Sequence, residues 1–272
     1  MVKRIRHKEG LDKNRLRLSS FVTFLIGFSQ AVLTYVMSSY FKLATGTESV
    51  GIFYGVSYVV YLMILFNLHK LVRLAGKSNV FYFSLLANII ISLFLTFSGP
   101  SIVGILLLML YIVVSHVVWV ALDVIIESFS VDRMSGRIRG LHLTIFNAGF
   151  LFGPFISTYI LDRIGFQGIF VFALIFNCLI FIFGLIGFRN INHKFERKLK
   201  IMGVLRRVAT KKDILRIYYV SFVLEFFYAL MTIYTPIYLR DLCFSLVCNV
   251  LIFIAILLPF VILQTPILVL SD

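Results

Sequence analysis

Residues 102–122 read IVGILLLMLYIVVSHVVWVAL and contain no Asp, Glu, Lys or Arg. An α-helix rises about 1.5 Å per residue, so about 20 such residues cross the roughly 30 Å of a bilayer's hydrocarbon core. The stretch therefore predicts a transmembrane helix. Apolar runs of comparable length lie at residues 18–41, 50–68, 80–97, 141–161, 168–188, 217–239 and 242–270. We expect an all-α membrane protein, a polytopic helix bundle with about eight transmembrane helices.

The composition agrees with a membrane protein. Hydrophobic residues make up 60% of the chain and charged residues 14%, whereas about 25% of residues are charged in a typical soluble domain. The three cysteines, Cys178, Cys243 and Cys248, have no metal-ligand spacing. We therefore predict neither a metal site nor a cofactor.

The basic residues gather on one side of the membrane. The odd gaps between the runs hold only Lys42, Arg163 and Arg240, and the even gaps and the N-terminal segment hold the other Lys and Arg residues. Because basic residues stay cytoplasmic, we predict a multi-pass protein of the cell (plasma or inner) membrane with both termini in the cytoplasm. This orientation explains the net charge of +14, so nucleic acid is not an expected partner. Anionic lipid head groups are the expected contact of the basic N-terminus.

The spacing of the gaps divides the chain into four parts. We predict a basic cytoplasmic N-terminus (1–17), a six-helix transmembrane half (18–188), a basic cytoplasmic linker (189–216) and two helices of a second half (217–272). A weak repeat crosses the linker: a shift of 198 residues aligns Ala31 with Ala229 and Thr34 with Thr232. Halves related by a parallel repeat are typical of some transporters.

The clearest motif lies in the fifth run. It consists of Gly140, eight residues, Gly149, three residues, Gly153-Pro154, two residues and Ser157-Thr158. Small residues four positions apart let two helices approach closely in lipid, and the proline permits a bend that neighbouring helices accommodate. The motif resembles the fifth-helix motif of major facilitator superfamily transporters, with its last two glycines replaced by hydroxyl residues. We expect Gly140, Gly149, Gly153 and Pro154 to serve helix packing and bending.

Charged residues flank this motif on the cytoplasmic side. The loop after the fourth run resembles the acidic and basic cluster that this superfamily carries there. Charges of both signs at a helix end can pair in one state and separate in another, as a gate does. A solvated loop with orienting arginines is the alternative. The predicted cytoplasmic gate comprises Arg73, Asp123, Glu127, Asp132, Arg137 and Arg139.

The last residues, Pro266–Asp272, resemble the opening of a second-half motif of the same family. The resemblance implies a fold of twelve spans, of which eight are present here. We therefore expect a transporter truncated in its second half, and an inactive fragment is an alternative to a working transporter.

Polar residues inside the runs mark candidate pathways, since they are costly in lipid and normally face a cavity or another helix. His116, Trp119, Asp123 and Glu127 share one face of the fourth run. His116 could exchange protons near neutral pH, or donate a hydrogen bond to a nearby carbonyl. Tyr54, Tyr58 and Tyr61 could line the same pathway or serve packing. The third run's Asn88, Ser92 and Thr96 are expected to make helix–helix hydrogen bonds instead.

Glu225 is the carboxylate that lies well inside a run. It could carry a proton or cation, contact a cationic substrate, or be a buried neutral acid. The predicted substrate or proton pathway comprises Gln30, Thr34, His116, Trp119, Asn147, Glu225, Tyr228 and Thr232.

Together these features favour a secondary active transporter that moves a small solute by alternating access, with a proton or cation as a possible coupling partner. The run 102–122 lacks the Arg that many proton-coupled exporters of this superfamily carry there, so direction and coupling ion stay open. A lipid-handling membrane enzyme is a further alternative. However, the sequence has no HExxH pair and no Gly-x-Ser-x-Gly elbow, and we do not expect an enzyme.

Overall fold

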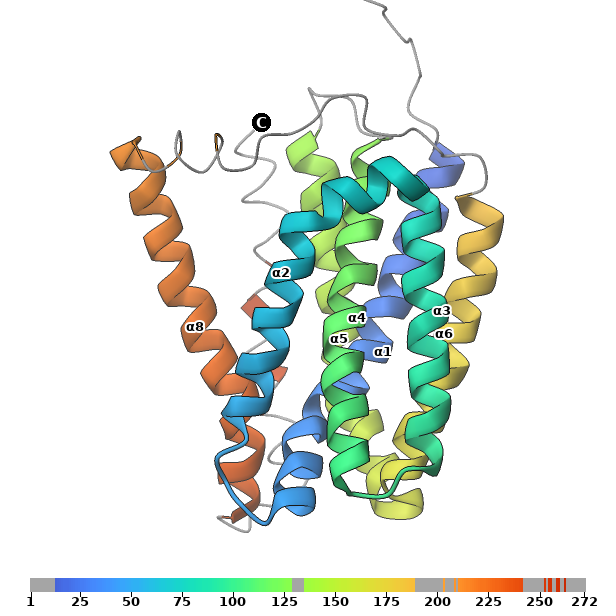
Figure 1. The fold of residues 1–272 in the computed structure, drawn as a ribbon, viewed down its shortest axis with the longest axis vertical. Coiled ribbons are helices and arrows are strands. Elements are labelled where there is room, and N and C mark those ends of the chain that lie inside the picture. The colour runs from blue at the N-terminus through green and yellow to red at the C-terminus, as the bar shows by residue number, and fades with distance from the viewer. Residues whose placement is uncertain are drawn as a thin grey trace, which may run out of the picture.

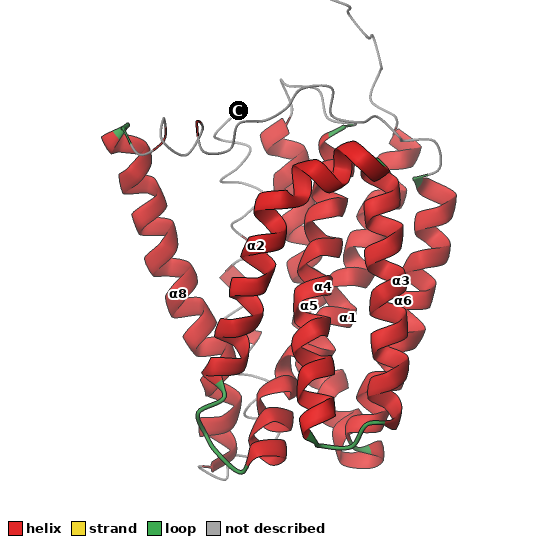
Figure 2. Cartoon of the chain, in the orientation of Figure 1, coloured by secondary structure: helices red, strands yellow, loops and turns green. Residues whose placement is uncertain are grey.

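The computed structural model describes residues 13–128, 135–188 and 210–241, with single residues at 203, 208, 252, 254, 255, 258, 259 and 262. In these ranges every regular element is an α-helix (Figure 2). The helices are α1 (Lys13–Thr45), α2 (Gly51–Ala75), α3 (Lys77–Phe97), α4 (Ile102–Glu127), α5 (Ser135–Ile164), α6 (Phe166–Gly187) and α8 (Lys212–Asp241). All seven are long and apolar enough to cross a membrane. The predicted all-α membrane bundle is thus confirmed, and the eighth run, 242–270, lies almost entirely outside the described residues.

Several helices extend beyond the apolar runs that predicted them. Helix α4 continues to Glu127, and α8 begins at Lys212 inside the stretch predicted as a linker. Charged side chains are tolerated at helix ends, where they can reach the polar head-group region, so a helix can continue beyond its apolar run. The apolar runs therefore mark the hydrocarbon-spanning part of each helix and underestimate its full length.

Short connections force neighbouring helices to run in opposite directions. Gly76 alone joins α2 to α3; it has a φ of 92°, which a residue with a side chain rarely adopts. Its N–H donates to the Val72 carbonyl at 2.9 Å and closes α2. At the start of α4 the Ser101 hydroxyl accepts from the Gly104 N–H at 3.2 Å, a helix cap.

Helix α1 is the centre of the bundle. It packs against α5, α6, α4 and α8, while α3 packs against α4, α6 and α2 (Figure 1). Helix α2 lies on α4, and α8 packs on α1 at the edge of the bundle (Figure 1). Most side chains of α8 are exposed in the described structure. The arrangement places α1, α2, α4 and α8, which carry most of the predicted pathway residues, around one region.

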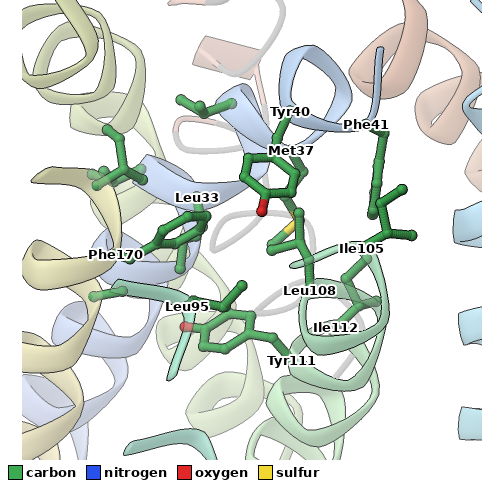
Figure 3. Packing of buried hydrophobic residues seen from close by; sticks show 14 of the residues in the cluster. Leu33, Met37, Tyr40, Phe41, Leu95, Ile105, Leu108, Tyr111, Ile112 and Phe170 are labelled. Carbon is green, nitrogen blue, oxygen red and sulfur yellow. The ribbon is translucent and has the colours of Figure 1, made fainter. Parts of the chain in front are cut away.

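Two clusters of buried apolar residues hold the bundle together. One, around Val22, Phe81 and Leu122, lies toward the end at which α1 begins. The other, around Leu33, Phe41 and Leu108, lies toward the opposite end and is shown in Figure 3. Lipid is as apolar as these side chains, so close packing rather than exclusion from water stabilises the contacts.

Candidate functional site

His116 of α4 lies among aromatic side chains of α2. Its ring centre is 5.1 Å from that of Tyr58 and 5.2 Å from that of Tyr61. The His116 Nδ1 lies 2.7 Å from the carbonyl oxygen of Ile112. A carbonyl only accepts, so Nδ1 carries the proton and Nε2 keeps a lone pair. The imidazole thus donates from Nδ1 to a carbonyl of its own helix, and its Nε2 remains available as a hydrogen-bond acceptor.

The three tyrosines of α2 divide into two roles. Tyr54 is buried, and its hydroxyl lies 3.0 Å from the Ser38 hydroxyl of α1. Tyr58 and Tyr61 instead lie against His116, and Tyr58 is 41% exposed. Tyr54 therefore packs α2 onto α1, and the other two tyrosines belong to the predicted pathway region.

One turn along α4 from His116, Trp119 contacts α5. Its ring centre is 4.2 Å from that of Phe146, which in turn lies 5.0 Å from Phe150. The face of α4 that carries His116 and Trp119 is thus placed between α2 and α5. Trp119 is the single tryptophan of the chain, so its fluorescence reports on this place alone.

Helix α8 brings a carboxylate to the same region. Glu225 interacts electrostatically with the hydroxyls of Tyr58 and Tyr228. Tyr228 packs against Ala31 and Tyr35 of α1. The exposed Glu225 of α8 thus lies within electrostatic range of Tyr58, which contacts His116, and we call Glu225, Tyr228, Tyr58 and His116 the Glu225 cluster.

Three other predicted pathway residues, Gln30, Thr34 and Thr232, donate hydrogen bonds to helix carbonyls. The Gln30 amide donates to the Ser115 carbonyl at 3.4 Å and links α1 to α4. The Thr34 hydroxyl donates to the Gln30 carbonyl at 2.8 Å, and Thr232 donates to the Tyr228 carbonyl of α8 at 2.9 Å. Thr34 and Thr232, which the sequence repeat aligns, thus make equivalent bonds within their own helices. Asn147 is half-buried on α5.

At the ends of α4 and α5 an ion pair joins the two helices. The Arg139 Nη2 lies 3.5 Å from the Asp123 Oδ2, and the two side chains are 66% and 42% exposed. Such an exposed pair contributes only about 0–1 kcal/mol to stability. It is therefore suited to breaking and re-forming at little cost.

The other predicted gate residues lie nearby or outside the described ranges. Lys77, at the start of α3, donates to the Ser128 hydroxyl at 3.0 Å and interacts electrostatically with Glu127. Arg73 is half-buried at the end of α2, and Arg137 is exposed at the start of α5. Asp132 lies outside the described residues. Lys77, which was not among the predicted gate residues, thus links α3 to the end of α4 and belongs to the same group of charged residues.

The glycine motif packs α5 against α1. A Cβ atom on Gly149 would lie 2.7 Å from backbone atoms of Phe24 and Phe28, and one on Gly153 would overlap Ala31. Gly140 is buried near the start of α5, and Pro154 lies within the helix without ending it. The Ser157 hydroxyl donates to the Pro154 carbonyl at 3.1 Å. Sequence reasoning did not identify Gly27 as the glycine of α1 that faces Phe146 in this contact.

A second histidine was missed by sequence reasoning. His142 of α5 is 4% exposed, and its Nδ1 lies 2.8 Å from the Thr23 hydroxyl oxygen of α1. Thr23 donates its own proton to the Ser19 carbonyl at 2.8 Å, so His142 Nδ1 is the donor. His142 lies seven residues before Gly149, two helical turns away on the same face, and that spacing was the signal available in the sequence.

The predicted hydrogen bonds of α3 are confirmed at two of three positions. Asn88 donates to the Ser115 hydroxyl of α4 at 3.1 Å, and Ser92 accepts from Asn177 of α6 at 3.2 Å. Thr96 donates instead to the Ser92 carbonyl of its own helix at 2.9 Å. These polar groups tie α3, α4 and α6 together inside the bundle, as expected where lipid offers no hydrogen-bond partner.

Comparison with known proteins agrees with this arrangement. No curated protein and no solved structure shows significant similarity to the chain. The family model described as Major Facilitator Superfamily matches residues 19–272, which is nearly the whole sequence. The match includes every helix from α1 to α8 apart from the first residues of α1. With its glycine motif packed on α1 and its polar groups set between the helices, this multi-pass membrane protein belongs to the major facilitator superfamily of transporters.

Proposed function

We propose that the chain is a secondary active transporter that moves a small solute across the cell membrane by alternating access, with both termini in the cytoplasm. The observation that carries the proposal is the Glu225 cluster: Glu225 and Tyr228 of α8, Tyr58 of α2 and His116 of α4. Ionisable groups within a membrane span are expensive and normally mark a pathway.

The surroundings of the cluster support a pathway rather than a metal centre. Among the residues that the structure describes, no group of three His, Cys, Asp or Glu side chains is placed to hold a metal ion. The Glu225 cluster instead combines one carboxylate, two phenol hydroxyls and an imidazole acceptor. Such groups bind a small polar solute, or a proton, by hydrogen bonds and charge.

Glu225 holds the central role in the proposed cycle. Its carboxylate binds the solute or its coupling proton or cation, and the hydroxyls of Tyr58 and Tyr228 lie within its electrostatic range. His116 accepts through Nε2, since its Nδ1 proton is directed to Ile112. Gln30 of α1 and Asn147 of α5 are the proposed lining of the pathway on those two helices. Trp119 of α4 lines it where its ring contacts Phe146 of α5.

The charged end of α4 and α5 is the proposed cytoplasmic gate. Asp123 and Arg139 are paired across the two helices, and Lys77 and Glu127 interact beside them. Alternating access requires contacts that exist in one state and separate in the other. Exposed ion pairs meet this requirement because they form and break at a cost of about 1 kcal/mol or less.

A transport assay tests the proposal. The purified chain is reconstituted into liposomes, and uptake of a broad panel of labelled solutes is measured under proton and sodium gradients. We expect gradient-driven uptake of at least one solute, and a loss of at least about tenfold in the Glu225→Gln variant. Glu48→Gln is the matched control, because Glu48 is 72% exposed in the loop between α1 and α2. Equal activity in the two variants would exclude Glu225 from the pathway.

A further inference from the structure

A small cavity lies inside the bundle, and none of the four residues of the Glu225 cluster lines it. Side chains of α1, α3, α4 and α6 line it. The polar ones are Ser29, Gln30, Asn88, Tyr111, Ser115 and Asn177, and apolar side chains such as Leu85 and Val118 complete the wall. The hydrocarbon core of a bilayer offers no hydrogen-bond partner, so each of these polar groups needs a partner inside the helix bundle.

Part of this hydrogen-bonding demand is met by the side chains themselves. The Asn88 Nδ2 donates to the Ser115 hydroxyl at 3.1 Å. The Asn177 Nδ2 donates to the Ser92 hydroxyl at 3.2 Å and approaches the Tyr111 hydroxyl oxygen at 3.5 Å. These bonds use both amide N–H groups of Asn177 and one of Asn88.

Two buried atoms at the cavity have no hydrogen-bond partner among the described residues. They are the Ser29 hydroxyl oxygen and the Asn88 Oδ1. Ser29 is 1% exposed and Asn88 is 2% exposed. The Tyr111 hydroxyl accepts from Asn177 at 3.5 Å and lies near the hydroxyls of Ser29 and Ser115. A buried polar group without a partner costs free energy, and here two such atoms border one cavity, close to the Tyr111 hydroxyl.

We propose that this cavity is a binding site for one water molecule that bridges α1, α3 and α4. The water accepts the proton of Tyr111 and donates its own two hydrogens to Asn88 Oδ1 and the Ser29 hydroxyl oxygen. It thereby makes three hydrogen bonds, the usual number for a buried water. The cavity leaves about 10 Å³ for the centre of a water molecule, which is close to the least that one water requires.

The lining favours water over a metal ion. Every side chain that borders the cavity is neutral, and a cation there would face no carboxylate. The free energy cost of moving a bare ion out of water far exceeds that of a neutral molecule. A water molecule can accept a hydrogen bond from the Tyr111 hydroxyl and donate one to the Asn88 Oδ1. A cation can bind only the acceptor atoms.

A double-mutant cycle in the purified chain tests the bridge. Ser29 and Asn88 make no bond to each other, so no direct hydrogen bond couples the effects of Ser29→Ala and Asn88→Leu on the melting temperature. With the water, we expect Ser29→Ala to lower the melting temperature by about 2–4 °C in the wild-type background. In the Asn88→Leu background the leucine displaces the water, and Ser29→Ala then has no effect or raises the melting temperature. Additive effects overturn the proposal.

Controls separate the bridge from general destabilisation. Ser38 of α1 is also buried but bonds directly to Tyr54, so Ser38→Ala should cost the same with or without Asn88→Leu. If Asn88→Leu does not fold, Tyr111→Phe takes its place in the cycle, because it removes the donor that the water accepts.

Two measurements on the wild-type chain need no variant. A high-resolution structure should show density within hydrogen-bond distance of Ser29, Asn88 and Tyr111, and a site without density overturns the proposal. The melting temperature should be equal in sodium, potassium and choline chloride. A rise specific to sodium, absent in Ser29→Ala, would identify a cation site and contradict the water.

Discussion

Gly149 of α5 lies so close to α1 that a Cβ atom on it would be 2.7 Å from the carbonyl oxygen of Phe24. Gly27 makes the reciprocal approach from α1, where a Cβ atom would overlap the Phe146 carbonyl oxygen. The two helices therefore meet backbone against backbone, in the way that small residues permit in lipid. An added methyl group has no space there unless a helix moves.

This contact predicts that Gly149→Ala destabilises the chain. Overpacking of this kind costs about 1–3 kcal/mol, so the thermal unfolding temperature in detergent should fall by several degrees. Gly55→Ala is the matched control, because Gly55 lies within α2 and a Cβ atom on it would meet nothing within 4 Å. Alanine is the better helix former by about 1 kcal/mol, so Gly55→Ala should leave the unfolding temperature unchanged or raise it. Equal shifts for both variants would contradict the packing account.

The Asp123–Arg139 pair predicts a loss of transport without a loss of stability. Both side chains are exposed, so Asp123→Asn should change the free energy of unfolding by less than about 1 kcal/mol. If the pair is the cytoplasmic gate, the same variant slows gradient-driven uptake several-fold, because one state of the cycle loses its closing contact.

Charge reversal separates pairing from the identity of each residue. The double variant Asp123→Arg, Arg139→Asp keeps the pair with its charges exchanged and should recover most of the uptake that either single reversal loses. A double variant as inactive as the two singles would show that these residues act separately and would remove the gate assignment.

The sequence was most informative where one physical demand governs each residue. The run at 102–122 predicts α4 because a chain in hydrocarbon must be helical to satisfy its own backbone. Asn88 and Ser92 were expected to bond across helices, and they do. The glycine motif predicted a close helix contact, and the structure identifies α1 as its partner.

Pairings between distant helices were beyond sequence reasoning. Thr23 and His142 are 119 positions apart, and nothing in either neighbourhood specifies the other. The position of Tyr58 beside His116 and within electrostatic range of Glu225 likewise depends on how α2, α4 and α8 are arranged in space. Helical periodicity gives the face of each helix, but the contact between two faces follows from the packing of the whole bundle.

The Thr23–His142 bond yields a stability prediction. Thr23→Val keeps the side chain's volume but removes the acceptor of the His142 Nδ1 proton. His142 is buried, so the unsatisfied donor should cost about 1–3 kcal/mol in the free energy of unfolding. Thr34→Val is the control: Thr34 also donates to the carbonyl four residues earlier, and this hydrogen bond stays within α1. We expect Thr34→Val to be clearly milder in a denaturation series, and a larger effect of Thr34→Val would refute the role of the bond.

The distribution of basic residues predicts the orientation of the chain, which single-cysteine labelling in intact cells can check. The three native cysteines are first replaced by serine. Glu48→Cys then marks the loop between α1 and α2, and Asp213→Cys marks the start of α8; the native side chains are 72% and 94% exposed. Because basic residues are retained in the cytoplasm, a membrane-impermeant maleimide should label Glu48→Cys from outside and should reach Asp213→Cys only after the membrane is permeabilised. Labelling of Asp213→Cys in intact cells would reverse the orientation and place the Asp123–Arg139 pair, at the same end of the bundle, on the outer face.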